Sequence, residues 1–225
     1  MIKAKRKPLT EIKQSIQAYD KVLIAGCGGC VSVCLAGGQK EVNILIAELD
    51  AELKLDGQTK KIEGHTLERQ CNVRFLDELA GLVPKYDCIL SMACGAGVQY
   101  LAERYPDIPV FPGVNTIAIG IDMDIGLYQE KCRACGECVL AYTAGICPVT
   151  GCAKSLFNGP CGGTNNGECE LGNSIPCAWY EIYNRLEKQG RLDNIINLRP
   201  PMQWQNQVRR TIVQDAYAHR YEPSS

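Results

Sequence analysis

Short apolar runs alternate with amphipathic segments along the first half of the chain. Four apolar runs have the length of a strand, at residues 21–25, 41–49, 87–93 and 108–111. Segments predicted to be helical lie at residues 10–19, 31–35, 67–83 and 97–105. Strands that alternate with helices at this spacing predict an α/β domain over residues 1–122, with a mostly parallel sheet and flanking helices.

A run of basic residues precedes the first predicted helix, at Lys3, Lys5, Arg6 and Lys7. A charge run this short is usually a solvated tail, and we expect one here. Thr10 is the expected N-cap of the helix that follows, because its hydroxyl can accept a backbone N–H of the first turn.

The alternation ends near residue 122, and residues 123–190 are rich in Gly, Pro, Asn and Cys. We predict a loop-rich, cysteine-dense region that depends on metal coordination for its stability. One amphipathic helix is expected at residues 178–189, with a core-facing side made of Trp179, Ile182, Tyr183 and Leu186. Residues 191–225 form a C-terminal tail that either wraps a partner or is a disordered end. Its aromatic and arginine residues include Trp204, Arg209, Arg210, Tyr217 and Tyr221.

Fourteen cysteines are the strongest chemical signal in the chain. In the first half, four of them stand at or near predicted strand ends: Cys27, Cys30, Cys71 and Cys94. The carboxyl ends of parallel strands share one edge of a sheet, so we expect these thiols to converge there and hold a metal cluster. Cys34 lies one helical turn beyond Cys30 and is an alternative ligand. Cys88 lies inside an apolar strand, where a free cysteine acts as a small buried hydrophobe.

The same edge leaves a nucleotide site open as an alternative. The turn Gly26-Cys27-Gly28 resembles the start of a dinucleotide-binding fingerprint, with Glu48 or Asp50 as the ribose partner. The third glycine position is Val31, so the pattern is incomplete. Two thiols also stand in the loop where phosphates would lie.

The second half holds eight more cysteines: Cys132, Cys135, Cys138, Cys147, Cys152, Cys161, Cys169 and Cys177. Two consecutive Cys-x-x-Cys steps and a later Cys-Pro are typical of iron–sulfur ligands. Zinc sites use two separate pairs or add histidine, and the chain has only His65 and His219. Eight thiolates suffice for two sites. Our first grouping joins the first three cysteines with one distant cysteine, and one site stays open to zinc.

Composition excludes several classes of protein. The formal net charge is −1, which gives no electrostatic footprint for nucleic acid. No apolar run reaches the length of a membrane span, and no apolar signal segment follows the first basic residues. A disulfide framework belongs to short secreted chains, so we expect a reducing, cytoplasmic setting with thiols reserved for metal.

Three short motifs carry a family resemblance: Asn-Gly-Pro-Cys-Gly-Gly at 158–163, Gly-Glu-Cys-Glu at 167–170 and Cys-Ala-Trp at 177–179. With them, the chain resembles the methylenetetrahydrofolate reductase C-terminal-domain family. Together with the turn at 26–30, it is similar to the small cysteine-rich (MetV-type) subunit of the acetogen-type reductase. The resemblance covers most of residues 20–190.

The resemblance implies a partner, a larger subunit that binds FMN and the folate and performs hydride transfer. The small subunit would carry two or three [4Fe–4S] clusters, with one zinc as a further option. It would pass electrons to or from the partner's flavin, in the methyl branch of the reductive acetyl-CoA pathway. Further electron-donor subunits are expected.

No Ser/His/Asp set, phosphate-binding loop or paired carboxylate frame appears in the sequence. We therefore expect an electron-transfer subunit that is not catalytic alone. Two alternatives stay open: a structural zinc or cluster module that stabilises the partner, and a nucleotide-binding oxidoreductase that uses the turn at Gly26.

Overall fold

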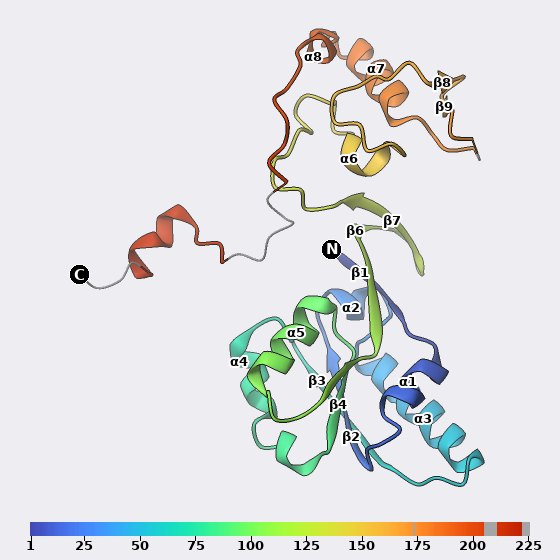
Figure 1. Ribbon diagram of the computed structural model, residues 1–225, viewed down its shortest axis with the longest axis vertical. Coiled ribbons are helices and arrows are strands. Elements are labelled where there is room, and N and C mark those ends of the chain that lie inside the picture. Colours follow the sequence, from blue (N-terminus) through green and yellow to red (C-terminus); the bar gives the residue numbers. More distant parts are fainter. Residues whose placement is uncertain (173, 205–210, 222–225) are drawn as a thin grey trace. The chain divides into compact units, whose positions relative to one another are not determined.

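The computed structural model describes residues 1–172, 174–204 and 211–221. The chain divides into two compact units, Met1–Lys131 and Cys132–Ser225 (Figure 1). Among the described residues, no helix combines the length and the apolar character needed to span a bilayer.

A four-stranded parallel sheet forms the centre of the first unit, with strand order β3-β2-β4-β5. Its strands are β2 Lys21–Cys27, β3 Lys61–Leu67, β4 Cys88–Ser91 and β5 Val110–Pro112. Strands β2 and β4 are buried almost throughout because they lie in the middle of the sheet. The predicted α/β class and the strands expected at residues 21–25, 87–93 and 108–111 are confirmed.

Helices cover both faces of this sheet (Figure 1). They are α1 Leu9–Ser15, α2 Cys30–Val33, α3 Gln39–Leu55, α4 Val73–Leu76 and α5 Gly95–Arg104. Residues of β2 alternate between the faces: Val22 and Ile24 pack in one apolar cluster, Leu23 and Ala25 in the other. The first cluster includes Leu45 of α3, and the second includes residues of α4 and α5.

Three sequence predictions for this unit are wrong in detail. Residues 41–49 are not a strand but the first part of α3, whose buried residues Val42, Leu45, Leu49 and Leu53 follow a helical spacing. The second strand is instead β3. The helix predicted at 67–83 is broken into α4 and two short 3-10 turns, η1 Asp77–Leu79 and η2 Val83–Lys85. The N-cap of α1 is Pro8, not Thr10.

The basic N-terminal run is not a solvated tail. It forms β1 Ile2–Arg6, which pairs with β6 Val114–Asp124, and β7 Leu127–Cys132 completes a second sheet. Lys3 is fully buried, forms an ion pair with Asp122 and lies 4.6 Å from the ring centre of Tyr128. Its charge is therefore compensated inside the fold. The first unit extends past the sheet end expected near residue 122.

The second unit consists mostly of loops around a small core. Its elements are α6 Pro148–Gly151, β8 Thr164–Asn165, β9 Glu168–Cys169, α7 Ala178–Lys188, α8 Asp193–Ile196 and the 3-10 helix η4 Asp215–Arg220. The amphipathic helix α7 is confirmed: Trp179, Ile182 and Leu186 are buried, although Tyr183 is exposed. With Ala144 these three side chains form a buried apolar cluster.

The first part of the C-terminal tail packs within its own unit. The amide of Asn158 exchanges two hydrogen bonds with the backbone of Arg199, and Met202 is buried. Arg209 and Arg210 lie outside the described residues. The wrapping of a partner by this tail stays a prediction.

Candidate metal centre

Four cysteines stand at one edge of the parallel sheet. Cys27 is the last residue of β2, and Cys30 is the first residue of α2. Cys71 lies between β3 and α4, and Cys94 is the N-cap of α5, just after β4. Since β3, β2 and β4 are parallel neighbours, these positions follow carboxyl ends that share one edge. In the part of the chain that the structure describes, no three Cys, His, Asp or Glu side chains are close enough to hold a single ion as they stand.

The electrostatics of Cys27 show which of these thiols are its neighbours. Burial raises the pKa of the Cys27 thiol, and hydrogen bonds from the backbone of Gln70 and Gly29 oppose this by lowering the pKa. Negative charge on Cys71 and Cys94 raises the same pKa further, so both sulfurs lie within electrostatic reach of Cys27.

The donor set fits a thiolate-ligated cluster. Cys30 and Cys71 are exposed, Cys94 is half-buried, and Cys27 is buried beneath backbone donors. Hydrogen bonds to the ligand sulfurs are one of the means by which proteins tune iron–sulfur clusters. A cluster places its thiolates on different iron atoms and so requires a wider arrangement than a single ion does.

Two further cysteines of this unit are held in other environments. The sulfur of Cys34 is buried, lies 3.4 Å from the backbone nitrogen of Ala4 and lies 3.5 Å from the oxygen of Val31. The contact with Ala4 ties the end of α2 to β1. Cys88 is fully buried in β4, which confirms it as a small core residue. Burial raises the pKa of the Cys88 thiol to about 12.

Cys88 therefore makes the stability of the first unit depend on pH. The folded state keeps the proton up to pH about 12, whereas an unfolded thiol loses it near pH 9. Unfolding thus becomes easier as pH rises above 9, because only the unfolded chain gains from deprotonation. We expect Cys88→Val to reduce this alkaline loss, as measured by urea unfolding of the metal-free protein between pH 7 and pH 10.5. Equal alkaline losses in both proteins would contradict the assignment.

The turn at Gly26 does not have the arrangement expected of a dinucleotide site. A Cβ at Gly26 would overlap the hydroxyl of Thr66 and stand 2.8 Å from a Val42 methyl, so tight packing accounts for this glycine. Glu48 and Asp50, the expected ribose partners, lie within α3 and not at a strand end. Glu48 instead pairs with Arg6 at 2.8 Å.

The eight cysteines of the second unit occupy loops and element ends. Cys132 ends β7, Cys147 is the N-cap of α6, and Cys152 follows α6 directly. Cys169 ends β9 and Cys177 is the N-cap of α7. The other three, in loops, are Cys135, Cys138 and Cys161.

Several contacts bring the later cysteines of this unit together. Cys152 and Cys177 pack against the same small core. A Cβ at Gly151 would lie 3.2 Å from Cβ of Ala178, so the neighbours of these two cysteines touch. The Lys154 ammonium, two residues after Cys152, lies 3.7 Å from the sulfur of Cys161. The grouping of the first three cysteines of the unit stays a prediction.

The environment of Cys161 favours its thiolate. The backbone N–H of Gly163 donates to its sulfur at 3.4 Å, and this bond together with the nearby Lys154 lowers the pKa of Cys161. Lys154 also forms an ion pair with Glu170. The thiolate is the form that binds metal. Cys132 accepts a similar bond, from the N–H of Ala134 at 3.3 Å.

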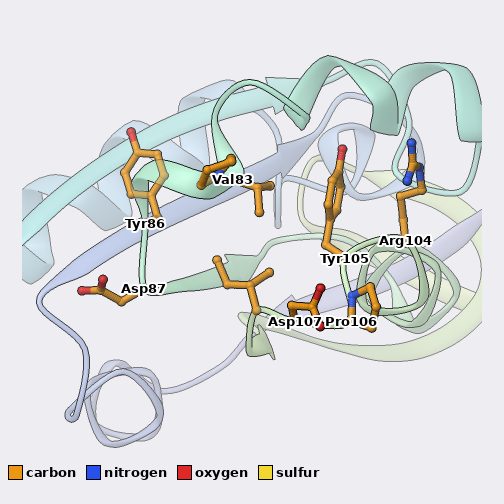
Figure 2. A pocket seen from close by; sticks show the side chains of 9 residues that line it. Val83, Tyr86, Asp87, Arg104, Tyr105, Pro106 and Asp107 are labelled. Atoms are coloured by element: carbon orange, nitrogen blue, oxygen red, sulfur yellow. The ribbon is translucent and has the colours of Figure 1, made fainter.

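A surface pocket lies away from the cysteine edge. It opens beside the residues that precede β4 and β5, at the opposite ends of these strands. Figure 2 shows Tyr86 and Tyr105 on either side of Val83. Of the nine described residues that line the pocket, none is a cysteine. Burial and a hydrogen bond to Glu63 raise the pKa of Tyr86 to about 12, so its hydroxyl stays neutral.

A comparison with known protein families finds one match, in the second half of the chain. Residues 111–205 match a family described as "Methylene-tetrahydrofolate reductase C terminal". No curated protein sequence and no solved structure matches the chain. The matched segment contains β6, β7 and all eight cysteines of the second unit, whereas the four cysteines at the sheet edge precede it. The match of residues 111–205 to this family confirms the resemblance carried by the motifs at 158–163, 167–170 and 177–179.

Proposed function

We propose that this chain is an iron–sulfur electron-transfer subunit of a flavin-dependent methylenetetrahydrofolate reductase complex, of the MetV type. The observation that carries the proposal is the match of residues 111–205 to a reductase family over a segment with eight free cysteines. The thiolate-favouring surroundings of Cys161 support a ligand role for that segment.

Three groups of residues would hold the metal. In the first unit they are Cys27, Cys30, Cys71 and Cys94. In the second unit they are two sets drawn from Cys132, Cys135, Cys138, Cys147, Cys152, Cys161, Cys169 and Cys177. When bound, [4Fe–4S] clusters supply one-electron transfer, and one second-unit site is open to zinc. The chain itself contributes thiolates, N–H donors to sulfur and the burial of Cys27.

The reacting groups belong to the partner. FMN and the folate bind to a larger reductase subunit, and this chain delivers or withdraws electrons at that flavin. Additional subunits supply the electrons. The reaction belongs to the methyl branch of the reductive acetyl-CoA pathway.

A structural zinc module is the second candidate. Its support is the small buried core of the second unit, which consists of Ala144, Trp179, Ile182 and Leu186. Metal coordination would stabilise such a unit whatever its redox role. Four thiolates alone do not distinguish iron from zinc.

Metal analysis of ligand variants tests the proposal. We expect anaerobically reconstituted protein to contain iron and sulfide and to give a paramagnetic resonance signal after dithionite reduction. The double variant Cys27→Ser, Cys94→Ser should lose about four iron atoms per chain, the content of one cluster. Cys88→Ala is the matched control and should keep them all, because Cys88 is a core residue. A colourless protein that binds zinc and gives no signal would refute electron transfer and favour the structural module.

A further inference from the structure

Gln70 is a fully buried polar residue beside an exposed cysteine. It immediately precedes Cys71, in the connection between β3 and α4. Its side-chain nitrogen donates hydrogen bonds to the oxygens of Ala25, at 2.8 Å, and Gly26, at 3.0 Å. These two residues lead directly into Cys27, so one side chain joins the Cys71 loop to the end of β2.

The other side of the same amide reaches the third cysteine loop. The hydroxyl of Ser91, the last residue of β4, donates to the Gln70 carbonyl oxygen at 2.7 Å. The Ser91 oxygen in turn accepts the N–H of Ala93 at 3.3 Å, directly before Cys94. Ser91 is fully buried as well. A chain of hydrogen bonds thus connects all three loops.

The backbone and the Cβ of Gln70 have close neighbours as well. The backbone hydrogen-bonds to the sulfur of Cys27 and lowers the pKa of that thiol. A Cβ at Gly97, in the first turn of α5, would come within 3.0 Å of the Gln70 Cβ. Only a residue without a side chain leaves room there. The amide therefore has one position, with both N–H groups and the oxygen bonded.

We infer that Gln70, acting through Ser91, is a positioning residue that holds Cys27, Cys71 and Cys94 together at the sheet edge before any metal binds. Gln70 is not itself a ligand; the thiolates would bind the metal. The inference rests on the proposed function for the nature of the native metal group. The positioning role itself concerns the metal-free protein and can be tested there.

The test uses the full metal-free chain and Cd²⁺ as the probe. Cysteines are alkylated in short anaerobic pulses at increasing Cd²⁺, and peptide mass spectrometry follows Cys27, Cys71 and Cys94 separately. Their side chains must close on Cd²⁺ from the wider spacing of the metal-free protein, and we expect the three to become protected together in the unaltered protein. Gln70→Met keeps the length of the side chain but removes the three hydrogen bonds. It should raise the Cd²⁺ concentration for half-protection at least tenfold.

Controls separate positioning from a general loss of structure. Gln99→Met changes the same chemical group on the exposed surface of α5 and should leave protection unchanged. Circular dichroism establishes that each variant is folded. If Gln70→Met does not fold, Ser91→Ala, which breaks only the link to the Cys94 loop, should release Cys94 from joint protection.

A folded Gln70→Met with unchanged half-protection would overturn the inference, even if its melting temperature fell. So would Ser91→Ala with unchanged protection of Cys94. An unaltered protein that takes up no iron but shows joint Cd²⁺ protection, lost in Gln70→Met, would refute the proposed function and keep the positioning role. The two proposals therefore fail on different measurements.

Discussion

Removal of metal is expected to unfold the second unit while the first unit stays folded. Among the described residues of the second unit, the buried apolar cluster holds only four side chains, and much of the chain is loop. Structural zinc contributes an apparent free energy of about 10–16 kcal/mol to folding in small cysteine-rich domains, and coordination here should matter on a similar scale. The first unit has two apolar clusters, one on each face of its sheet, and does not need metal to bury them.

Hydrogen exchange followed by mass spectrometry measures this difference. After chelation, amides of α7 should exchange at the rate of an unfolded chain. Amides of β2 and α3 should stay protected and serve as the internal control in the same sample. If α7 stays protected without metal, the second unit has a sufficient core of its own and the expectation is wrong.

Gly37→Ala is expected to destabilise the first unit and to disturb its cysteine edge. A Cβ at Gly37 would overlap the backbone oxygen of Met92 and stand 3.0 Å from the carbonyl carbon of the same residue. The oxygen of Gly37 accepts the N–H of Cys27 at 2.8 Å, and the N–H of Met92 donates to Ala25 at 2.8 Å. The added methyl must therefore push the loop before α3 away from the ends of β2 and β4.

Neither of these backbone segments can yield without breaking sheet hydrogen bonds. Overpacking usually costs 1–3 kcal/mol, so we expect a loss of about 3 kcal/mol in the free energy of unfolding. Urea denaturation of the metal-free protein measures it, and iron analysis should show reduced loading of the first unit. Gly81→Ala is the matched control, because a Cβ there has open space, and it should change stability by less than about 0.5 kcal/mol. An unchanged midpoint for Gly37→Ala would contradict the steric argument.

Central strands could be predicted from the sequence because burial on both faces makes them continuously apolar. This holds for β2 and β4. The edge strand β3 is exposed or half-buried at every position except Leu67. It reads Lys-Ile-Glu-Gly-His-Thr-Leu, a composition that does not indicate a strand. The apolar start of α3 fits a strand as well as a helix, since a nine-residue run with apolar residues on several faces is typical of either structure.

The pairing of β1 with β6 cannot be predicted from the sequence for a different reason. Its two strands are more than 100 residues apart, and Ile2 pairs with Ile119. A basic segment such as β1 looks solvated until its partner is known. Lys3 is buried only because Asp122 and the ring of Tyr128 meet it.

Residues that support the cysteines could not be predicted from the sequence. Gln70 and Lys154 have no unusual spacing, and neither belongs to a recognisable motif. Their roles arise from partners elsewhere in the chain: Ala25, Gly26 and Ser91 for Gln70, Cys161 and Glu170 for Lys154. Adjacency to Cys71 is the one signal that could have drawn attention to Gln70.

The cysteines of the sequence are sufficient to predict thiol-based metal chemistry for this protein. The number of cysteines, their spacing and the family motifs can be read directly from the sequence, without knowledge of the fold. The place of four cysteines near strand ends also followed from the pattern, because parallel strands share an edge.

The tertiary structure alone decided how each thiol behaves. Burial keeps Cys88 protonated. Burial raises the pKa of Cys27 while backbone donors lower it, and the N–H of Gly163 together with a nearby lysine favours the thiolate of Cys161. Desolvation and charge interactions depend on distances between segments that are remote in the chain, and a one-dimensional pattern does not contain these distances.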